Sequence, residues 1–358
     1  MSTAEIDNLL TKEVTDSKTP SVRYLIFDKD KILHSFHYGN ADILNQKPVS
    51  EQTTFLGYSI TKTFTALAIM QLADQQKIDL DLPVIKYLPD FPYNPEITVR
   101  QLLNHTAGVP NPIPLSWIHL AADHASFDSK AFFQKIYRKH AKTKSRPNAR
   151  YAYSNLGYVL LGEIIESVSG NSYQEYVQKN ILDRLKLNPG DLSFAIADPG
   201  MQAKGYHKRN TVLYFMLDLF LDTDKFMDQK EGKWKSFKSN YVNGAAYGGL
   251  IGTPNALVKY IQELLQPESK LISNAGRKEM FTENYTSNGK ATGMCLSWFK
   301  GRLNGNTYLA HAGGGGGYYC EIRIYPEKGI GSVIMFNRTG ISDERFLDKT
   351  DKFIVDEK

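Results

Sequence analysis

Ser59 and Lys62 are the residues whose types and spacing point most directly to chemistry. They stand where a short polar segment runs into an apolar stretch, Thr63 to Leu72, which predicts a helix beginning near Ser59. A lysine three residues after a serine lies on the same face of a helix, one turn further on. Burial of this lysine lowers its pKa, so its amine can take or relay the proton of the serine hydroxyl. The pair predicts a serine nucleophile.

The spacing of this pair is not specific by itself. Ser287 with Lys290 and Ser297 with Lys300 repeat it. The first repeat lies in a polar loop, and the second lies in an aromatic stretch that reads as a strand, where residues three apart face opposite sides. Only Ser59 has the helical context that the chemistry needs.

Tyr153 and Asn155 form a second group of candidates, directly before another long apolar stretch. A lysine nearby favours the phenolate form of tyrosine, so Tyr153 can act as a base toward Ser59 and later activate water. The same Tyr-x-Asn spacing recurs at Tyr38 and Tyr241, so the position before a helix is what singles out Tyr153.

His311 forms a third group with the glycines that follow it. It closes a strand-like segment and runs into the glycine run 313–317. Glycines beside a strand let a ligand approach the backbone closely. We therefore expect Gly313 and Gly314 to bind substrate, their N–H groups forming an oxyanion hole with that of Ser59.

Together these motifs resemble the serine β-lactamase and penicillin-binding protein superfamily, whose signature joins Ser-x-x-Lys to Ser-Asp-Asn and Lys-Thr-Gly. Tyr153 to Asn155 is similar to the class C-like branch, which has Tyr-x-Asn as its second element. This branch includes β-lactamases, DD-peptidases, D-amino-acid peptidases and esterases. Further similar segments span roughly residues 20 to 340 in the right order: 64–72, 77–81, 85–89, 100–110, 157–166 and 248–254.

The resemblance implies a role for each candidate. Ser59 would form an acyl-enzyme, Lys62 and Tyr153 would transfer protons, and Asn155 would orient Lys62 and the acyl side of the substrate. No Glu-x-x-Leu-Asn element of the class A type is present, so deacylation would fall to Tyr153.

His311 departs from the family pattern because many β-lactamases have lysine there. Its unperturbed pKa of about 6.5 would make its charge change within the working range. Two roles stay open: recognition of an anionic substrate group, or a hydrogen bond that holds Tyr153 or the strand. A histidine in place of lysine should anchor a substrate carboxylate more weakly, and the glycine run 313–317 leaves the floor of the site without side chains. Both features favour small esters, or amides with a D-configured residue, over β-lactams.

The predicted function is therefore a serine hydrolase of the carboxylesterase or D-amino-acid peptidase kind, possessing at most weak β-lactamase activity. One alternative is a β-lactamase or DD-carboxypeptidase proper. Another is a penicillin-binding or sensor module with little turnover, although retention of Ser59, Lys62, Tyr153 and Asn155 favours an enzyme. An α/β-hydrolase is disfavoured because no Gly-x-Ser-x-Gly elbow occurs.

The expected fold class is α/β, with an antiparallel sheet flanked by helices, built from both termini, and an inserted mainly helical domain. Alternation predicts strands over 22–28, 32–38, 292–300, 307–312, 318–325 and 331–337. We assign 1–58 and 266–358 to the sheet domain and 59–265 to the helical domain, with the active site in the cleft between them. The insertions 110–147 and 205–245 are expected to wall that cleft.

The composition and motifs of this chain limit the kinds of partner that it is expected to bind. Its 358 residues carry 43 basic and 38 acidic side chains, a net charge of +5, whose densest basic cluster over 135–146 reads as a solvated face. No motif predicts binding of nucleic acid, a cofactor or a metal, so the expected partner is a small ester, amide or β-lactam. Cys295 and Cys320 are expected to be buried thiols.

The amino terminus predicts a location. The first ten residues contain no apolar signal-peptide core, so the chain as written is expected to be cytoplasmic, whereas a trimmed leader would make it an exported protein. No apolar run approaches the roughly eighteen residues of a membrane span.

Overall fold

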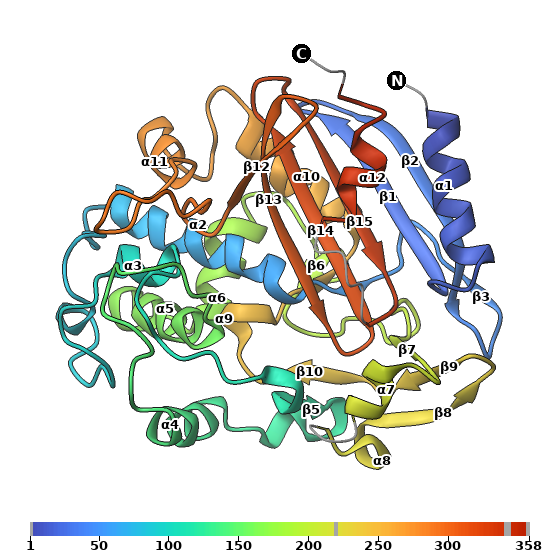
Figure 1. Ribbon diagram of the computed structural model, residues 1–358, viewed down its shortest axis with the longest axis horizontal. Coiled ribbons are helices and arrows are strands. Elements are labelled where there is room, and N and C mark those ends of the chain that lie inside the picture. Colours follow the sequence, from blue (N-terminus) through green and yellow to red (C-terminus); the bar gives the residue numbers. More distant parts are fainter. Residues whose placement is uncertain (1–2, 218–220, 340–344, 356–358) are drawn as a thin grey trace.

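A seven-stranded antiparallel sheet forms the centre of the protein and takes its strands from both ends of the chain (Figure 1). The computed structural model describes residues 3–217, 221–339 and 345–355. The strand order is β12-β13-β14-β15-β1-β2-β3. The strands are β1 (Ser21–Asp28), β2 (Ile32–Asp42), β3 (Lys47–Pro48), β12 (Phe299–Leu303), β13 (Asn306–Gly315), β14 (Tyr318–Tyr325) and β15 (Ile330–Phe336).

Both faces of the sheet are buried at its central strands β1, β14 and β15, which explains why these strands read as nearly continuous hydrophobic runs. Successive side chains of β1 point to opposite faces. Val22 and Tyr24 join one apolar cluster with Ile6 of the first helix, whereas Leu25 and Phe27 join the main core on the other side. The alternation therefore divides each strand between two cores.

Helices cover the two faces of the sheet (Figure 1). The terminal helices α1 (Thr3–Thr15) and α12 (Leu347–Asp351) pack on one face, and α10 (Pro254–Leu265) packs on the other against β1 and β15. The remaining helices are α2 (Thr61–Asp74), α3 (Val99–Leu103), α4 (Ser129–Lys139), α5 (Asn155–Ser169), α6 (Tyr173–Val177), α7 (Val212–Leu217), α8 (Thr223–Phe226), α9 (Ala245–Gly248) and α11 (Asn274–Met280).

Helix α2 is buried on every side, because α5, α9 and α11 all pack against it. Its run from Thr61 to Leu72 is buried throughout, as expected of a helix that is apolar all round. Short 3-10 or π turns connect the helices: Tyr58–Ile60, Val84–Lys86, Pro114–Ser116, Ala121–Ser126 and Gln178–Leu182.

Three small antiparallel sheets lie outside the central one. One of them joins the two segments expected to be insertions, since Ile118 pairs with Val242. Their strands are β4 (Phe55–Leu56), β5 (Ile118–Leu120), β6 (Leu192–Ser193), β7 (Tyr206–Lys208), β8 (Met227–Glu231), β9 (Trp234–Phe237), β10 (Asn240–Val242) and β11 (Ile251–Gly252).

The predicted fold class is confirmed, while one predicted strand is wrong in its extent. We expected a strand over 292–300, but β12 begins only at Phe299. The Cys295 N–H donates to Trp298 O at 2.7 Å, which folds this segment into a tight turn, and Ser297 between them has a positive φ of 71°. A turn held by its own backbone bonds cannot also pair along a sheet edge.

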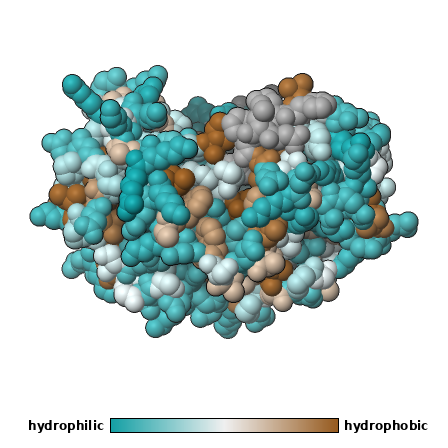
Figure 2. Space-filling model, turned by 90° about the horizontal axis from the view of Figure 1, so that it is seen from below, coloured by the Kyte–Doolittle hydropathy of each residue, from teal (hydrophilic) through white to brown (hydrophobic). Residues whose placement is uncertain are grey.

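The surface that carries α4 and β8 is largely hydrophilic, and apolar side chains gather near its middle (Figure 2). Within the described residues, no helix combines the length and the apolar character that a membrane crossing requires.

Candidate active site

Ser59 lies in a turn with a strained backbone. The 3-10 turn Tyr58–Ile60 leads directly into α2, and Tyr58 has a positive φ of 43°. Non-glycine residues in this region cost on the order of 1 kcal/mol and persist only where their surroundings hold them. The Tyr58 hydroxyl donates to Gly316 O at 2.8 Å, and the Gly57 N–H donates to Leu250 O at 2.8 Å. These contacts hold Ser59 one turn before Lys62.

Lys62 is fully buried beneath Ser59. Its Nζ lies 2.8 Å from Ser59 Oγ and donates to Tyr247 O at 2.8 Å. The rings of Tyr153, Tyr158 and Tyr247 surround the nitrogen at 5.1, 5.6 and 5.3 Å from their centroids. Burial alone lowers the pKa of Lys62 well below its usual value. The amine is therefore suited to accept a proton from Ser59.

Tyr153 approaches Ser59 from the start of α5, its hydroxyl 2.9 Å from Ser59 Oγ. The neighbouring Ser154 caps α5 by accepting from Gly157 N–H at 3.1 Å. The backbone N–H of Ser154 donates to His105 Nδ1 at 3.1 Å, and the ring of His105 lies 4.3 Å from that of Tyr153. The helix cap and His105 together fix the position of the phenol.

Asn155 lies at the first turn of α5 without the contact that we expected. Its backbone N–H donates to Asn111 Oδ1 at 3.0 Å, and its own Oδ1 is buried with no hydrogen-bond partner among the described residues. No hydrogen bond joins Asn155 to Lys62 in the described structure; Tyr247 O is the main-chain acceptor that orients the amine. An orienting role of Asn155 toward Lys62 stays a prediction.

His311 is buried in β13, and its expected charge change near neutral pH is wrong. Its Nδ1–H donates to Ser297 O, while Nε2 has no hydrogen-bond partner among the described residues. Burial and, to a lesser extent, the charge of Lys62 lower the pKa of His311 to about 3. The imidazole is therefore neutral across the working range and provides no positive charge for a substrate carboxylate.

The glycines after His311 bring the backbone of β13 against the Ser59 turn. A Cβ at Gly313 would lie 2.9 Å from Ser59 N and 2.3 Å from Gly57 O, so only glycine fits there. At Gly314, which is exposed, a Cβ would meet nothing closer than 3.9 Å. The turn and the strand thus bring the backbone of Gly313 beside Ser59 N, while the oxyanion hole expected from Gly313 and Gly314 stays a prediction.

Two contributors to this site had no clear sequence signal. Tyr247 acts through its carbonyl, which any residue type can offer. His105 accepts from the Ser154 N–H and packs its ring against that of Tyr153, which is a structural role. Its pKa is lowered well below the usual value by burial, followed by Lys62 and His311, so it too is neutral.

His105 and His311 thus provide no positive charge to bind a substrate. Within the described residues, no group of three His, Cys, Asp or Glu side chains gathers in a way that could hold a metal ion. Cys320 is buried and free, and its Sγ donates to Gly57 O at 2.9 Å just before the Ser59 turn. Cys295 is also a buried free thiol.

The sequence of this chain is similar to those of known proteins. The family model described as Beta-lactamase matches residues 6–356. Penicillin-binding protein 4* of Bacillus subtilis is 27% identical over 305 residues, covering 80% of this chain and 61% of its own length. Protein flp of Staphylococcus aureus (strain N315) is 24% identical and covers 99% of this chain and 67% of its own length. The chain therefore spans about two thirds of these relatives.

Solved structures share the fold. The octameric penicillin-binding protein homologue from Pyrococcus abyssi has a TM-score of 0.76 and 26% identity, covering 94% of this chain and 74% of its own. The D-amino acid amidase from Ochrobactrum anthropi SV3 has a TM-score of 0.78 and 22% identity, covering 98% of both chains. From the family match and the shared fold, this chain belongs to the beta-lactamase family of serine hydrolases.

Proposed function

We propose that this protein hydrolyses small esters or amides through an acyl ester on Ser59. The observation that carries the proposal is the meeting of three groups at one oxygen. Ser59 Oγ lies 2.8 Å from Lys62 Nζ and 2.9 Å from the Tyr153 hydroxyl. A nucleophile with two proton-transfer groups in hydrogen-bond reach is the arrangement that covalent catalysis needs.

Acylation starts from a neutral Lys62. As Ser59 Oγ attacks the substrate carbonyl, its proton passes to Lys62 Nζ, and the N–H groups of Ser59 and the glycine run stabilise the oxyanion. The carbonyl then reforms and the bond to the leaving group breaks. The proton on Lys62 returns through Tyr153 to the leaving oxygen or nitrogen, so that Lys62 is again neutral and Ser59 carries the acyl group.

Deacylation reverses these roles with water as the nucleophile. Tyr153 passes its hydroxyl proton to the neutral amine of Lys62 and takes a proton from the water that attacks the acyl carbon. As the ester bond breaks and the acid leaves, Tyr153 gives a proton to Ser59 Oγ and regains one from Lys62, so that Ser59, Lys62 and Tyr153 all return to their starting states. Asn155 Oδ1, which is buried without a partner in the described residues, is available to accept a hydrogen bond from the acyl side of the substrate.

The substrate class follows from the neutral surroundings of the site. His311 is neutral and cannot anchor a carboxylate, which disfavours β-lactams and favours neutral esters and amides. The fold shared with the D-amino acid amidase adds amides with a D-configured residue to the substrates to be tested. Turnover of such substrates would distinguish this protein from a β-lactamase or a DD-carboxypeptidase proper.

A substrate panel tests the proposal. The purified protein and its Ser59→Ala variant are given p-nitrophenyl acetate and butyrate, D-alanine p-nitroanilide and nitrocefin. We expect kcat/KM for an ester or for the D-amino acid anilide to exceed that for nitrocefin by tenfold or more, with no turnover by the variant. Faster hydrolysis of nitrocefin by a wide margin would instead assign a β-lactamase, and a stable adduct without turnover would assign a penicillin-binding module.

A further inference from the structure

A second cavity lies along α5, apart from the Ser59 site. Its volume is about 990 Å³, and its walls come from α4, α5 and the segment 241–249. Ser59, Lys62, Tyr153 and Asn155 are not among its lining residues. Glu163, which lines it, follows Asn155 by eight residues and thus lies about 12 Å further along the helix axis. The cavity is large enough for a drug-sized organic molecule.

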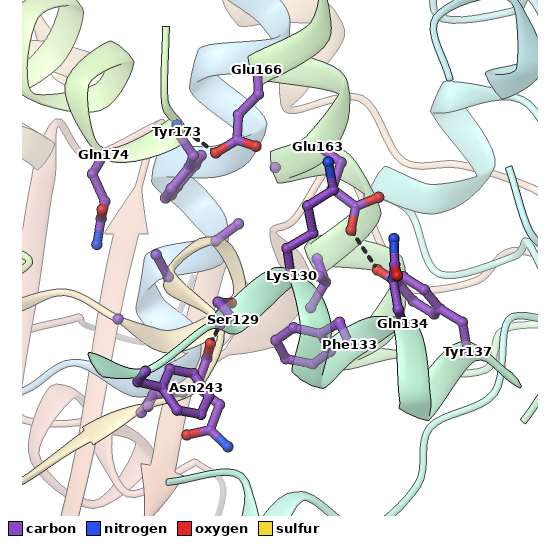
Figure 3. Close-up of a pocket in the computed structure, with 18 of the residues that line it drawn as sticks. Ser129, Lys130, Phe133, Gln134, Tyr137, Glu163, Glu166, Tyr173, Gln174 and Asn243 are labelled. Carbon is purple, nitrogen blue, oxygen red and sulfur yellow. Dashed lines mark hydrogen bonds between the residues drawn. The ribbon is translucent and has the colours of Figure 1, made fainter. Parts of the chain in front are cut away.

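Aromatic rings make up much of its wall. Phe133 and Tyr137 of α4 face Tyr173 across the open space, and Phe91 and Phe194 also line it (Figure 3). Such rings offer an apolar surface to a ligand body and a negative face to a cation. They would accept an apolar or aromatic group that carries a positive charge.

Glu163 is one of the carboxylates that line this cavity. The Tyr137 hydroxyl donates to its Oε1 at 3.0 Å (Figure 3), and no lysine or arginine nitrogen of the described residues lies within 4.0 Å of it. The pKa of Glu163 is raised, chiefly by burial. The hydrogen bond from Tyr137 opposes this shift, the charge of Glu166 adds to it, and the charge of Lys130 opposes it least. Glu163 thus has no ion-pair contact within the described residues, and Lys130 acts on it only from beyond 4.0 Å.

The other polar groups of the wall add acceptors. Glu166 lies three residues after Glu163 on the same helix and accepts from Tyr173 N–H at 2.9 Å. His119 and His124 are joined by a hydrogen bond of 2.8 Å between Nε2 and Nδ1. Because His119 Nδ1 donates to Asn243 Oδ1, its Nε2 accepts from His124, which leaves His124 Nε2 as a further acceptor.

Lys130 and Arg138 of α4 also line the cavity, and both are exposed, so water screens their charges. The cavity therefore combines apolar walls with a carboxylate that has no ion pair within 4.0 Å in the described residues. That combination matches a ligand with an ammonium group and an aromatic body.

We propose that this cavity is a second binding site, separate from the Ser59 site, for a primary amine on an aromatic body. Its ammonium group would donate to Glu163, on the side toward Glu166, while its ring packs against Phe133 and Tyr173. This site goes beyond the proposed hydrolysis, because it needs neither Ser59 nor Lys62.

Isothermal titration calorimetry of the full chain with 2-phenylethylamine tests the site. We expect the amine to bind at least tenfold more tightly than 2-phenylethanol, its neutral isostere, and than phenylacetate, its anionic counterpart. Blocking Ser59 with a fluorophosphonate, or replacing it in Ser59→Ala, should change the amine affinity less than twofold. Loss of amine binding upon blocking would place the amine in the hydrolytic site and overturn the proposal.

A pair of variants completes the test. Glu163→Gln keeps the shape of the side chain and should weaken amine binding at least tenfold. Glu268→Gln removes the same charge from an exposed position outside the cavity and should leave binding unchanged. Equal affinity of wild type and Glu163→Gln would overturn the proposal. If circular dichroism shows that Glu163→Gln does not fold, the wild-type comparison of amine with alcohol decides, since equal affinities there also overturn it.

Discussion

Ser59 Oγ lies within hydrogen-bond distance of the two groups that we propose transfer protons, Lys62 Nζ and the Tyr153 hydroxyl. A lysine ammonium could only donate to this oxygen, and burial, which lowers the pKa of Lys62 well below its usual value, favours the neutral amine that the proposed mechanism needs. The spacing of Ser59 and Lys62 predicted that the two side chains share a helix face. The sequence could not predict that Tyr247 O accepts from Lys62, because every residue type has a backbone carbonyl.

Removing either proton-transfer group should slow the reaction without unfolding the protein. We expect Lys62→Ala and Tyr153→Phe each to lower kcat/KM for an ester by a factor of roughly one hundred to ten thousand, the usual cost of losing a general base. Tyr151→Phe, which removes a hydroxyl two residues away, is the matched control and should stay within a few fold. Steady-state kinetics decide, and near-normal turnover by Tyr153→Phe would place the base elsewhere.

His311 makes a prediction about stability. Its pKa is about 3 in the folded protein and about 6.5 when unfolded, so the unfolded chain takes up its proton first as the pH falls. The stability that depends on neutral His311 is therefore present above pH 6.5 and is lost between about 6.5 and 3. Between pH 7 and pH 5 this loss amounts to about 2 kcal/mol.

Urea unfolding at the two pH values measures this contribution. Wild type should lose about 2 kcal/mol more than His311→Gln between pH 7 and pH 5, because glutamine takes up no proton. The same loss in both proteins would show that His311 is not held neutral. The sequence alone gives only the unperturbed pKa of a histidine, so it could not predict that the fold buries His311 and lowers its pKa.

At the scale of elements, the site depends on strand β13 lying against the turn before α2. The helical stretch after Ser59 and the strand before the glycine run were both predicted from hydrophobic patterning. The left-handed Tyr58 was not, because partners far along the chain, Gly316 O and Leu250 O, hold that turn. Local sequence contains no record of such long-range contacts.

Two adjacent glycines test this packing. A Cβ at Gly315 would lie 2.4 Å from the ring of Tyr58, whereas one at Gly314 would meet nothing closer than 3.9 Å. We expect Gly315→Ala to lower the free energy of unfolding by about 1 to 3 kcal/mol and Gly314→Ala to change it by less than about 0.5 kcal/mol. Chemical denaturation measures both. Equal stability of the two variants would mean that β13 is not pressed against the Tyr58 ring.

At the scale of the whole molecule, the site draws on both regions of the chain. Ser59, Lys62 and Tyr153 come from the helical region, and His311 comes from the central sheet. The order of the motifs, together with strands at both ends, predicted this architecture. It could not reveal the cavity beside Glu163, because that space arises from the packing of α4, α5 and the segment 241–249, which are separate in sequence.

Intact-mass spectrometry after incubation with a fluorophosphonate shows whether Ser59 is the nucleophile. A neutral Lys62 at 2.8 Å should activate Ser59 enough to give one adduct per chain. Wild type should therefore gain a single phosphonyl mass, and Ser59→Ala should gain none. Heat-denatured wild type is the control for nonspecific labelling. An adduct of equal yield on the folded Ser59→Ala variant would contradict the account.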